Sequence, residues 1–308
     1  MKNIKVKGYN NFELAGYLWD NVENPKGVVQ IIHGMQEHAK RYDDFAKYLN
    51  SIGLIVFASD LRGHGQTAII NNLPFGYSDG DIFMEIVKDQ IKITEFLQNK
   101  FGLPISIFGH SFGSMIAQRY MVENGFKIKN IVICGSTYTN SFQFRAGYHV
   151  AKICRFFKGK KADAKLIEKM SVAGYGKKFK NGNWLSRDEK NWERYTSDEL
   201  CGKVFPTNFY WSFFKNARNN YKNLNNIPYY LPIFLIAGTN DPVSGKNGIA
   251  KLFFTYGKAK KKVFLKTYAN ARHELLNETN KEEVYKDVGQ FILNDTLDYI
   301  PIHLTSSK

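Results

Sequence analysis

Short apolar runs recur along the chain and alternate with segments whose apolar residues have helical spacing. Each run is rich in Ile, Val or Phe, which is typical of strands that are covered on both faces. The six runs are Gly27–His33, Leu54–Ser59, Pro104–Phe108, Ile128–Gly135, Leu231–Ala237 and Lys261–Tyr268. This alternation predicts an α/β fold, in which a mostly parallel central sheet has helices on both faces.

Apolar residues three and four positions apart predict helices around these strands. The helices are expected over Tyr42–Leu49, Ile82–Leu97, Met115–Val122 and Val284–Ile292, with another near Lys246–Tyr256. At the beginning of the chain, Ile4 and Val6 alternate with polar residues, Asn10-Asn11 is a turn signal, and Phe12–Trp19 is apolar again. This pattern predicts a hairpin ahead of the parallel strands.

One long stretch interrupts the alternation. About 90 residues, Thr137–Ile227, separate two strands that a single short helix could join. The stretch is basic and rich in Phe and Trp. We predict an inserted, mainly helical lid over residues 137–227, with residues 1–136 and 228–308 forming the core domain. Its aromatic side chains have two explanations that can hold together, a core of the lid itself and the wall of an apolar substrate pocket.

Candidate chemistry begins with Gly109-His110-Ser111-Phe112-Gly113, a G-x-S-x-G pattern. The pattern alone is weak, because a chain with 25 glycines can contain it by chance. Its place is more informative, since it follows a predicted strand and precedes the helix-forming residues Ser114–Gln118. A strand-to-helix turn of this kind strains the serine backbone and holds the hydroxyl at the carboxyl end of the strand. Ser111 is therefore the predicted nucleophile.

A serine hydroxyl needs a base to remove its proton, and the base needs an orienting acid. After an elbow of this kind, acid and base follow the serine along the chain, which leaves His149, His273 and His303 as candidate bases. His149 lies in the expected lid and His303 in the final tail, whereas His273 closely follows a predicted strand. We predict His273 as general base and acid. Asp241, after the preceding strand, is the predicted orienting acid, although Asn-Asp-Pro is also a common purely structural turn.

The negative charge that forms during attack needs two backbone N–H donors. One is expected from Phe112, the residue after the nucleophile. The other is expected from Met35, in the loop His33-Gly34-Met35 that follows the first predicted parallel strand. Gly34 would allow the backbone to approach closely at this point.

The formal net charge is +15, and its distribution is more informative than its size. Ten basic and two acidic residues lie between Ala151 and Lys180, inside the expected lid. This segment is either a solvated surface in a lysine-rich chain or a surface that contacts anionic membrane lipids. Nucleic acid is not expected as a partner, because no binding motif accompanies the charge.

Other sequence features argue against a cofactor, a metal or a membrane span. The three widely spaced cysteines, Cys134, Cys154 and Cys201, form neither a disulfide framework nor a zinc pattern. Residues 63–68 match a dinucleotide-binding pattern, but Asn71, Asn72, Pro74 and Gly76 indicate that no helix opens there. The first residues do not resemble a signal peptide, and no apolar run of about 18 residues occurs. We expect a cytoplasmic protein, peripheral at the membrane if the basic segment binds lipid.

Together these residues resemble the monoacylglycerol lipase and lysophospholipase branch of the α/β-hydrolases, which is grouped with the serine aminopeptidase-like hydrolases. The matching blocks are His33–His38 with Arg41-Tyr42, Asp60–Gly65, the Gly109–Gly113 elbow, Asp241 with His273, and Trp184–Glu189 in the expected lid. The resemblance implies the same triad and oxyanion donors, and a single-chain lipid ester as substrate. It differs at Phe112, where members usually have Met, and at Gln36, where a small residue is commoner. Glu37, His38 and Arg41 are expected to tie the oxyanion loop to its neighbours.

Three functions follow as hypotheses. The first is a serine carboxylester hydrolase that cleaves monoacylglycerol-like or lysophospholipid-like esters through an acyl-enzyme. The second is an aminopeptidase or amidase of the same fold, which would need lid carboxylates to hold the ammonium of a small peptide. The third is a non-catalytic binding protein, which predicts a damaged triad or oxyanion loop, and the sequence shows neither.

Overall fold

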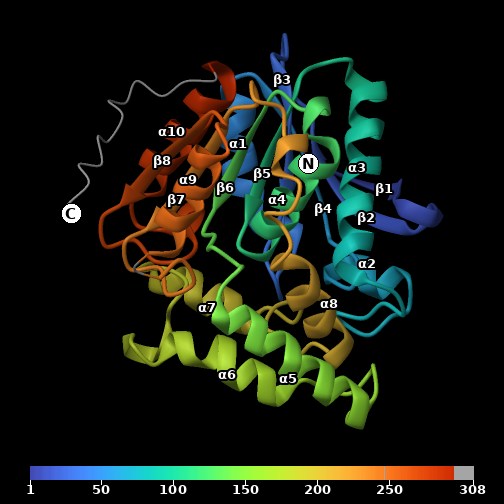
Figure 1. Ribbon diagram of the computed structural model, residues 1–308. Coiled ribbons are helices and arrows are strands. Elements are labelled where there is room, and N and C mark those ends of the chain that lie inside the picture. Colours follow the sequence, from blue (N-terminus) through green and yellow to red (C-terminus); the bar gives the residue numbers. More distant parts are fainter. Residues whose placement is uncertain (246, 295–308) are drawn as a thin grey trace.

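Eight strands form one sheet in the computed structural model, which describes residues 1–245 and 247–294 (Figure 1). The strand order is β1-β2-β4-β3-β5-β6-β7-β8. Strands β1 and β2 are antiparallel to their neighbours, and all pairs from β4 to β8 are parallel. The strands are β1 (Lys2–Lys7), β2 (Glu13–Trp19), β3 (Gly27–Ile32), β4 (Leu54–Ser59), β5 (Ile105–His110), β6 (Asn130–Cys134), β7 (Ile233–Gly238) and β8 (Val263–Tyr268).

The predicted α/β fold with a mostly parallel sheet is confirmed. The central strands β3 to β7 are buried along their whole length, as their continuous apolar sequences require. The register places apolar residues beside one another, since Val28 of β3 pairs with Ile55 on one side and with Ile105 on the other. The expected amino-terminal hairpin is also present as β1 and β2, and its turn uses Asn10 and Asn11 with positive φ.

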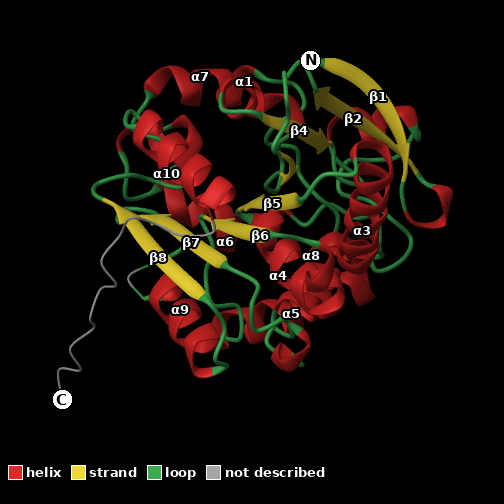
Figure 2. Cartoon of the chain, turned by 90° about the horizontal axis from the view of Figure 1, so that it is seen from above, coloured by secondary structure: helices red, strands yellow, loops and turns green. Residues whose placement is uncertain are grey.

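Helices cover both faces of the sheet (Figure 2). On one face, α1 (Asp43–Ser51) and α10 (Lys281–Asn294) contribute Phe45, Leu49 and Val288 to one apolar cluster. On the other face, α3 (Ile82–Phe101), α4 (Phe112–Asn124) and α9 (Gly248–Lys258) pack in a second cluster. These five helices include the predicted helical segments, each longer or shifted by a few residues.

The residues between β6 and β7 carry four helices: α5 (Phe142–Lys158), α6 (Lys165–Gly176), α7 (Glu189–Ser197) and α8 (Thr207–Ala217). They lie together beyond the carboxyl ends of the parallel strands (Figure 1). Helix α8 packs against α3 and α4, and α5 packs on α8. Because Phe209 and Tyr210 of α8 belong to the main apolar cluster, part of the insertion is continuous with the core of the molecule. Treating residues 137–227 as a separate lid domain therefore stays a prediction.

One expectation from the sequence is wrong. A short helix, α2 (Gly65–Ile70), opens directly after Gly63-His64. The carboxylate of Asp60 lies at the first turn of α2, where its Oδ2 accepts a hydrogen bond from the Gln66 N–H at 2.7 Å. A Cβ on Gly65 would lie 2.3 Å from the same oxygen. His303 and the rest of residues 295–308 lie outside the described residues, as does Lys246 at the expected start of α9.

Candidate active site

Ser111 lies in the sharp turn between β5 and α4, with φ 52° and ψ −120°. Left-handed backbone is unfavourable for a serine and persists only where the surrounding structure imposes it. The neighbouring glycines show why. A Cβ on Gly113 would lie 2.1 Å from the carbonyl oxygen of Ile32, and one on Gly109 would lie 2.8 Å from that of Gly113. The elbow therefore needs glycine on both sides of Ser111.

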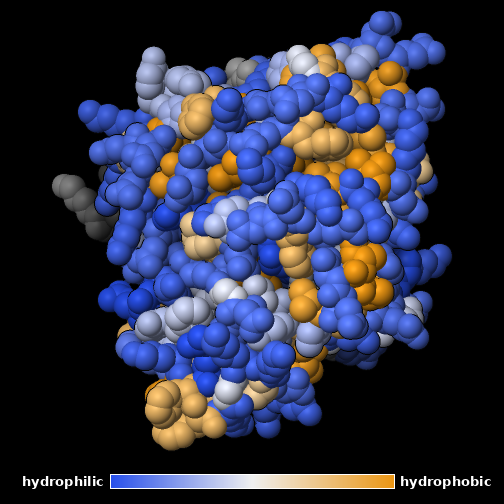
Figure 3. Space-filling model, turned by 90° about the vertical axis from the view of Figure 1, so that its right-hand side faces the viewer, coloured by the Kyte–Doolittle hydropathy of each residue, from blue (hydrophilic) through white to orange (hydrophobic). Residues whose placement is uncertain are grey.

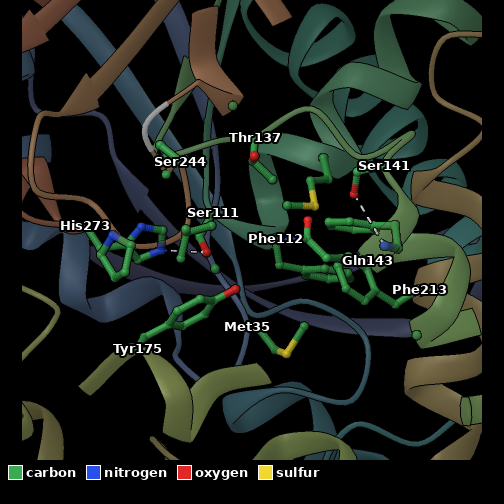
Figure 4. A pocket seen from close by; sticks show the side chains of 18 of the residues that line it. Met35, Ser111, Phe112, Thr137, Ser141, Gln143, Tyr175, Phe213, Ser244 and His273 are labelled. Carbon is green, nitrogen blue, oxygen red and sulfur yellow. Dashed lines mark hydrogen bonds between the residues drawn. The ribbon is translucent and has the colours of Figure 1, made fainter. Parts of the chain in front are cut away.

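The structure brings the three predicted triad residues together. Nε2 of His273 lies 2.8 Å from Ser111 Oγ (Figure 4). Its Nδ1 lies 3.0 Å from Asp241 Oδ1. Asp241 follows β7 and His273 follows β8, so adjacent strand ends supply both side chains. Candidate His149 lies on α5 and does not line the cavity described below.

Asp241 is held in its charged form. Its carboxylate also accepts hydrogen bonds from Ser244 Oγ and the Val243 N–H, each at 2.8 Å. Burial alone would raise the pKa of Asp241, but the charge and hydrogen bond of His273, together with these two donors, hold it below its ordinary value. Sequence reasoning did not identify Ser244, although a serine three residues after the acid could have suggested it.

The two residues predicted to supply the oxyanion donors lie beside Ser111 in the structure. Met35 and Phe112 line a cavity with the serine, and Phe112 is the first residue of α4, where the N–H has no partner within the helix. Within residues 1–245 and 247–294, no hydrogen bond uses the N–H of Met35 or Phe112. Gly34 N–H, in contrast, donates to Glu37 Oε1 at 2.6 Å, which fixes the loop beside Met35.

A buried ionic cluster connects the oxyanion loop to the loop of His273. Arg41 Nη1 donates to Glu37 and to Glu274, both at 2.7 Å, and Nη2 donates to Glu274 at 2.8 Å. Burial opposes the charge on both carboxyl groups, but the guanidinium of Arg41 holds the pKa of each below its ordinary range. Asn191 of α7 donates to Glu274 at 2.8 Å, so the insertion joins the same cluster. Glu37 and Arg41 thus occupy the tying positions that the sequence suggested.

The cavity beside Ser111 has a volume of about 770 Å³. Much of its wall is apolar, with side chains from the elbow and from the insertion; these include Met35, Phe112, Met115, Phe144, Val150, Phe213 and Phe214. Polar residues line it as well, among them Thr137, Ser141 and Gln143 (Figure 4), together with Asn247. Phe144, Phe213 and Phe214 also pack on one another, so the aromatic residues form both the core of the insertion and the cavity wall.

Among the described residues, one group has the spacing of metal ligands. A ring nitrogen of His38, a carboxylate oxygen of Asp198 and Sγ of Cys201 lie within 4.8 Å of one another. His38 Nε2 already pairs with Asp198 at 2.8 Å, and none of the three residues lines the cavity. His38 therefore ties the oxyanion loop to the insertion, as expected from the sequence.

Comparison with known proteins agrees with this geometry. The family described as serine aminopeptidase, S33, matches residues 23–280. The chain belongs to this family of α/β-hydrolases. Within the S33 family it falls in the branch that contains the monoglyceride lipases. It is 25% identical to a monoglyceride lipase homolog of Monkeypox virus, over 90% of this chain and 92% of that one. It is also 25% identical to a monoacylglycerol lipase of Mycolicibacterium smegmatis, over 93% and 95% of the two chains.

Solved structures of other α/β-hydrolases show the same fold as this S33 member. A thermostable carboxyl esterase from Bacillus coagulans superposes with a TM-score of 0.86 at 24% identity, covering 94% of this chain and 97% of the esterase. A monoglyceride lipase from Saccharomyces cerevisiae superposes with a TM-score of 0.74 at 20% identity, covering 97% and 96%. These superpositions establish the fold, and the family match establishes the hydrolase class.

Proposed function

We propose that this S33-family member is a serine carboxylester hydrolase that cleaves single-chain lipid esters through an acyl-enzyme. The observation that carries the proposal is the hydrogen-bonded series Asp241–His273–Ser111, which opens into a large and mainly apolar cavity. A cavity of this kind suits one acyl chain, and relatives that align over nine-tenths of the chain are named monoglyceride lipases.

In the proposed reaction, Ser111 Oγ attacks the ester carbonyl while His273 Nε2 takes its proton. The N–H groups of Met35 and Phe112 donate to the oxyanion of the tetrahedral intermediate. When the intermediate collapses, the bond to the alcohol breaks and His273 returns the proton to the leaving oxygen. A water molecule then attacks the acyl-enzyme by the same route and releases the fatty acid. The chain and water supply every group in this mechanism.

The second candidate, an aminopeptidase, needs a free carboxylate to hold the substrate ammonium. In the described part of the chain, the acidic residues that line the cavity are Glu37 and Glu274. Arg41 binds both of them, so neither offers an unpaired negative charge. This pairing favours the ester over the peptide.

We also propose that the insertion touches anionic lipid. Large apolar side chains stand exposed on α5, namely Phe142 (81% exposed), Phe156 (81%) and Phe157 (78%). An apolar group projects from the lower end of the molecule, in the part that the insertion forms (Figure 3). Basic side chains lie close in sequence, including Lys152, Lys158, Lys160 and Lys161. A cytoplasmic location with peripheral membrane contact is the corresponding prediction.

A fluorophosphonate probe and a substrate panel test the proposed function. The probe should label the folded protein at Ser111 and leave Ser111→Ala unlabelled. The panel compares monoacylglycerols, lysophospholipids and alanyl or prolyl arylamides, with Ser111→Ala as the blank. We expect hydrolysis of the esters, reduced at least about 10⁴-fold by Ser111→Ala. Turnover of arylamides alone would favour the aminopeptidase, and no labelling of folded protein would exclude the serine mechanism.

A further inference from the structure

Tyr175 places a hydroxyl in the cavity that the proposed mechanism does not use. The residue lies on α6 of the insertion, lines the cavity, and points toward Ser111 (Figure 4). Its ring lies 5.2 Å from the ring of Trp184, and the Trp184 ring lies 5.0 Å from that of His273. These aromatic contacts hold Tyr175 on the same side of Ser111 as the proposed base.

The Tyr175 hydroxyl differs from those of two other tyrosines in the cavity wall. Tyr195 donates to the Gln36 carbonyl oxygen at 3.3 Å, and Tyr210 donates to Glu168 at 3.2 Å. Within the part of the chain that the structure describes, no group makes a hydrogen bond with the Tyr175 hydroxyl, and this hydroxyl is not fully buried but stays accessible from the cavity. Burial, with a smaller effect of the charge on Asp241, raises the pKa of Tyr175 to about 12, so the group stays a donor at neutral pH. The hydroxyl therefore has a hydrogen-bond donor that a molecule bound in the cavity can use.

The two sides of Ser111 accept different parts of an ester. His273 must return its proton to the leaving oxygen, so the alcohol part has to lie beside His273. Phe112 and Phe213 lie on the other side of the serine and offer an apolar wall to the acyl chain (Figure 4). We propose that Tyr175 donates a hydrogen bond to a hydroxyl oxygen of the alcohol part, and so selects esters of polyhydric alcohols. This inference rests on the proposed ester hydrolysis.

A pair of esters with the same acyl chain tests the inference. Wild type and Tyr175→Phe are compared on 1-monooctanoylglycerol and on methyl octanoate, each below its micellar concentration. The substitution removes the hydroxyl and keeps the ring on Trp184. We expect kcat/KM for the glycerol ester to fall about 10-fold, mainly through KM, while the methyl ester changes less than about 2-fold. Tyr229→Phe is the matched control, because that ring is 78% exposed and should leave both activities unchanged.

The outcomes separate the two proposals. An equal loss on both esters would show that Tyr175 acts only by supporting Trp184 and His273, and would overturn the selection of polyhydric alcohols. An unchanged KM for the glycerol ester would overturn it as well. If wild type cleaves methyl octanoate, ester hydrolysis stands whatever Tyr175 does. If wild type cleaves neither ester, the proposed function fails and this inference fails with it.

Discussion

At the scale of single residues, the elbow depends on the absence of a Cβ atom at Gly113. Gly113 approaches the carbonyl oxygens of Ile32 and His33 so closely that a Cβ would lie 2.1 and 2.4 Å from them. The opposing atoms belong to the backbone of β3 and the loop after it, so no side chain can turn away. The fixed position of Ser111 follows from this close approach.

Gly113→Ala should therefore lower the free energy of unfolding by about 3 kcal/mol or more and abolish labelling of Ser111 by a fluorophosphonate. Urea unfolding and probe labelling measure the two effects. Gly257→Ala in α9 is the matched control, because nothing lies within 4 Å of the added Cβ. That change should be neutral or stabilise the protein by up to about 1 kcal/mol. Equal effects at the two glycines would contradict the steric argument.

Phe112 combines a backbone role with a side-chain role. Its N–H is a proposed oxyanion donor, and its ring packs against Phe83, Phe209 and Phe213, the last of which also lines the cavity. Phe112→Met keeps the N–H and nearly the same volume, so stability should change by less than about 1.5 kcal/mol. We expect activity to persist with a shift in preferred acyl length, measured on a series of monoacylglycerols. A large loss on every chain length would indicate instead that the ring positions the oxyanion loop.

At the scale of elements, one helix of the insertion packs on the core and another exposes apolar side chains. Helix α8 is buried against the core, whereas α5 exposes Phe156 and Phe157 beside basic residues. If α5 docks on lipid, the double variant Phe156→Ser/Phe157→Ser should weaken binding to phosphatidylserine vesicles at least about 10-fold in a flotation assay. Wild-type binding should also weaken steeply as salt rises, because the basic residues contribute.

Phe126→Ser provides the comparison for this test. Phe126 is 61% exposed and lies in the turn after α4, outside α5 and its basic neighbours. The Phe126→Ser substitution should leave vesicle binding unchanged. The proposal would be wrong if wild type does not bind the vesicles. It would also be wrong if binding changes neither with salt nor with the double substitution at Phe156 and Phe157; α5 would then be an ordinary solvated surface.

The sequence predicted the elements well where one physical rule dominated. The six apolar runs match six strands whose ends lie within two residues of the predicted ends. For β3 to β7 the reason is burial on both faces, which demands continuous apolar sequence, whereas β8 at the edge of the sheet is only partly buried. Prediction failed at α2, where Asp60 stabilises a short helix that periodicity does not reveal. The contacts of Trp184 with His273 and of Tyr175 with Trp184 were also beyond prediction. Their positions depend on how the insertion folds back over the strand ends, and no local pattern encodes that.

At the scale of the whole molecule, Arg41 joins parts of the chain that are far apart in sequence. It binds Glu37 near the beginning and Glu274 near the end, and all three side chains are buried. Both carboxyl groups have a folded pKa below the ordinary value. The unfolded chain therefore binds more protons than the folded one in acid. The stability from these groups is present above the unfolded glutamate pKa of about 4.3 and declines as pH falls through the folded values.

Arg41→Met should lower the free energy of unfolding at pH 7 by about 3–5 kcal/mol, since it leaves two buried carboxylates without a cation. The deficit should shrink toward pH 4, where those groups take up protons in the variant. Urea unfolding at several pH values measures this. Arg194→Met, at a side chain that is 63% exposed, should cost less than about 0.5 kcal/mol at every pH. If the loss of unfolding free energy in Arg41→Met does not vary with pH, Arg41 stabilises the fold through packing and not through its charge.

The order of strands in the sheet also bears on the behaviour of many copies in solution. Strands β1 and β8 lie at its two ends, where unpaired backbone groups could accept a strand from another molecule. Both strands carry lysines. Lys2, Lys5 and Lys7 lie in β1, Lys266 lies in β8, and Lys261 and Lys262 come just before β8. Lys5 and Lys7 pair with Glu13, and Lys266 pairs with Asp287, so a strand added at either edge would have to displace these charged side chains or leave them without solvent. Part of the large positive charge therefore acts against edge-to-edge aggregation, independently of any lipid.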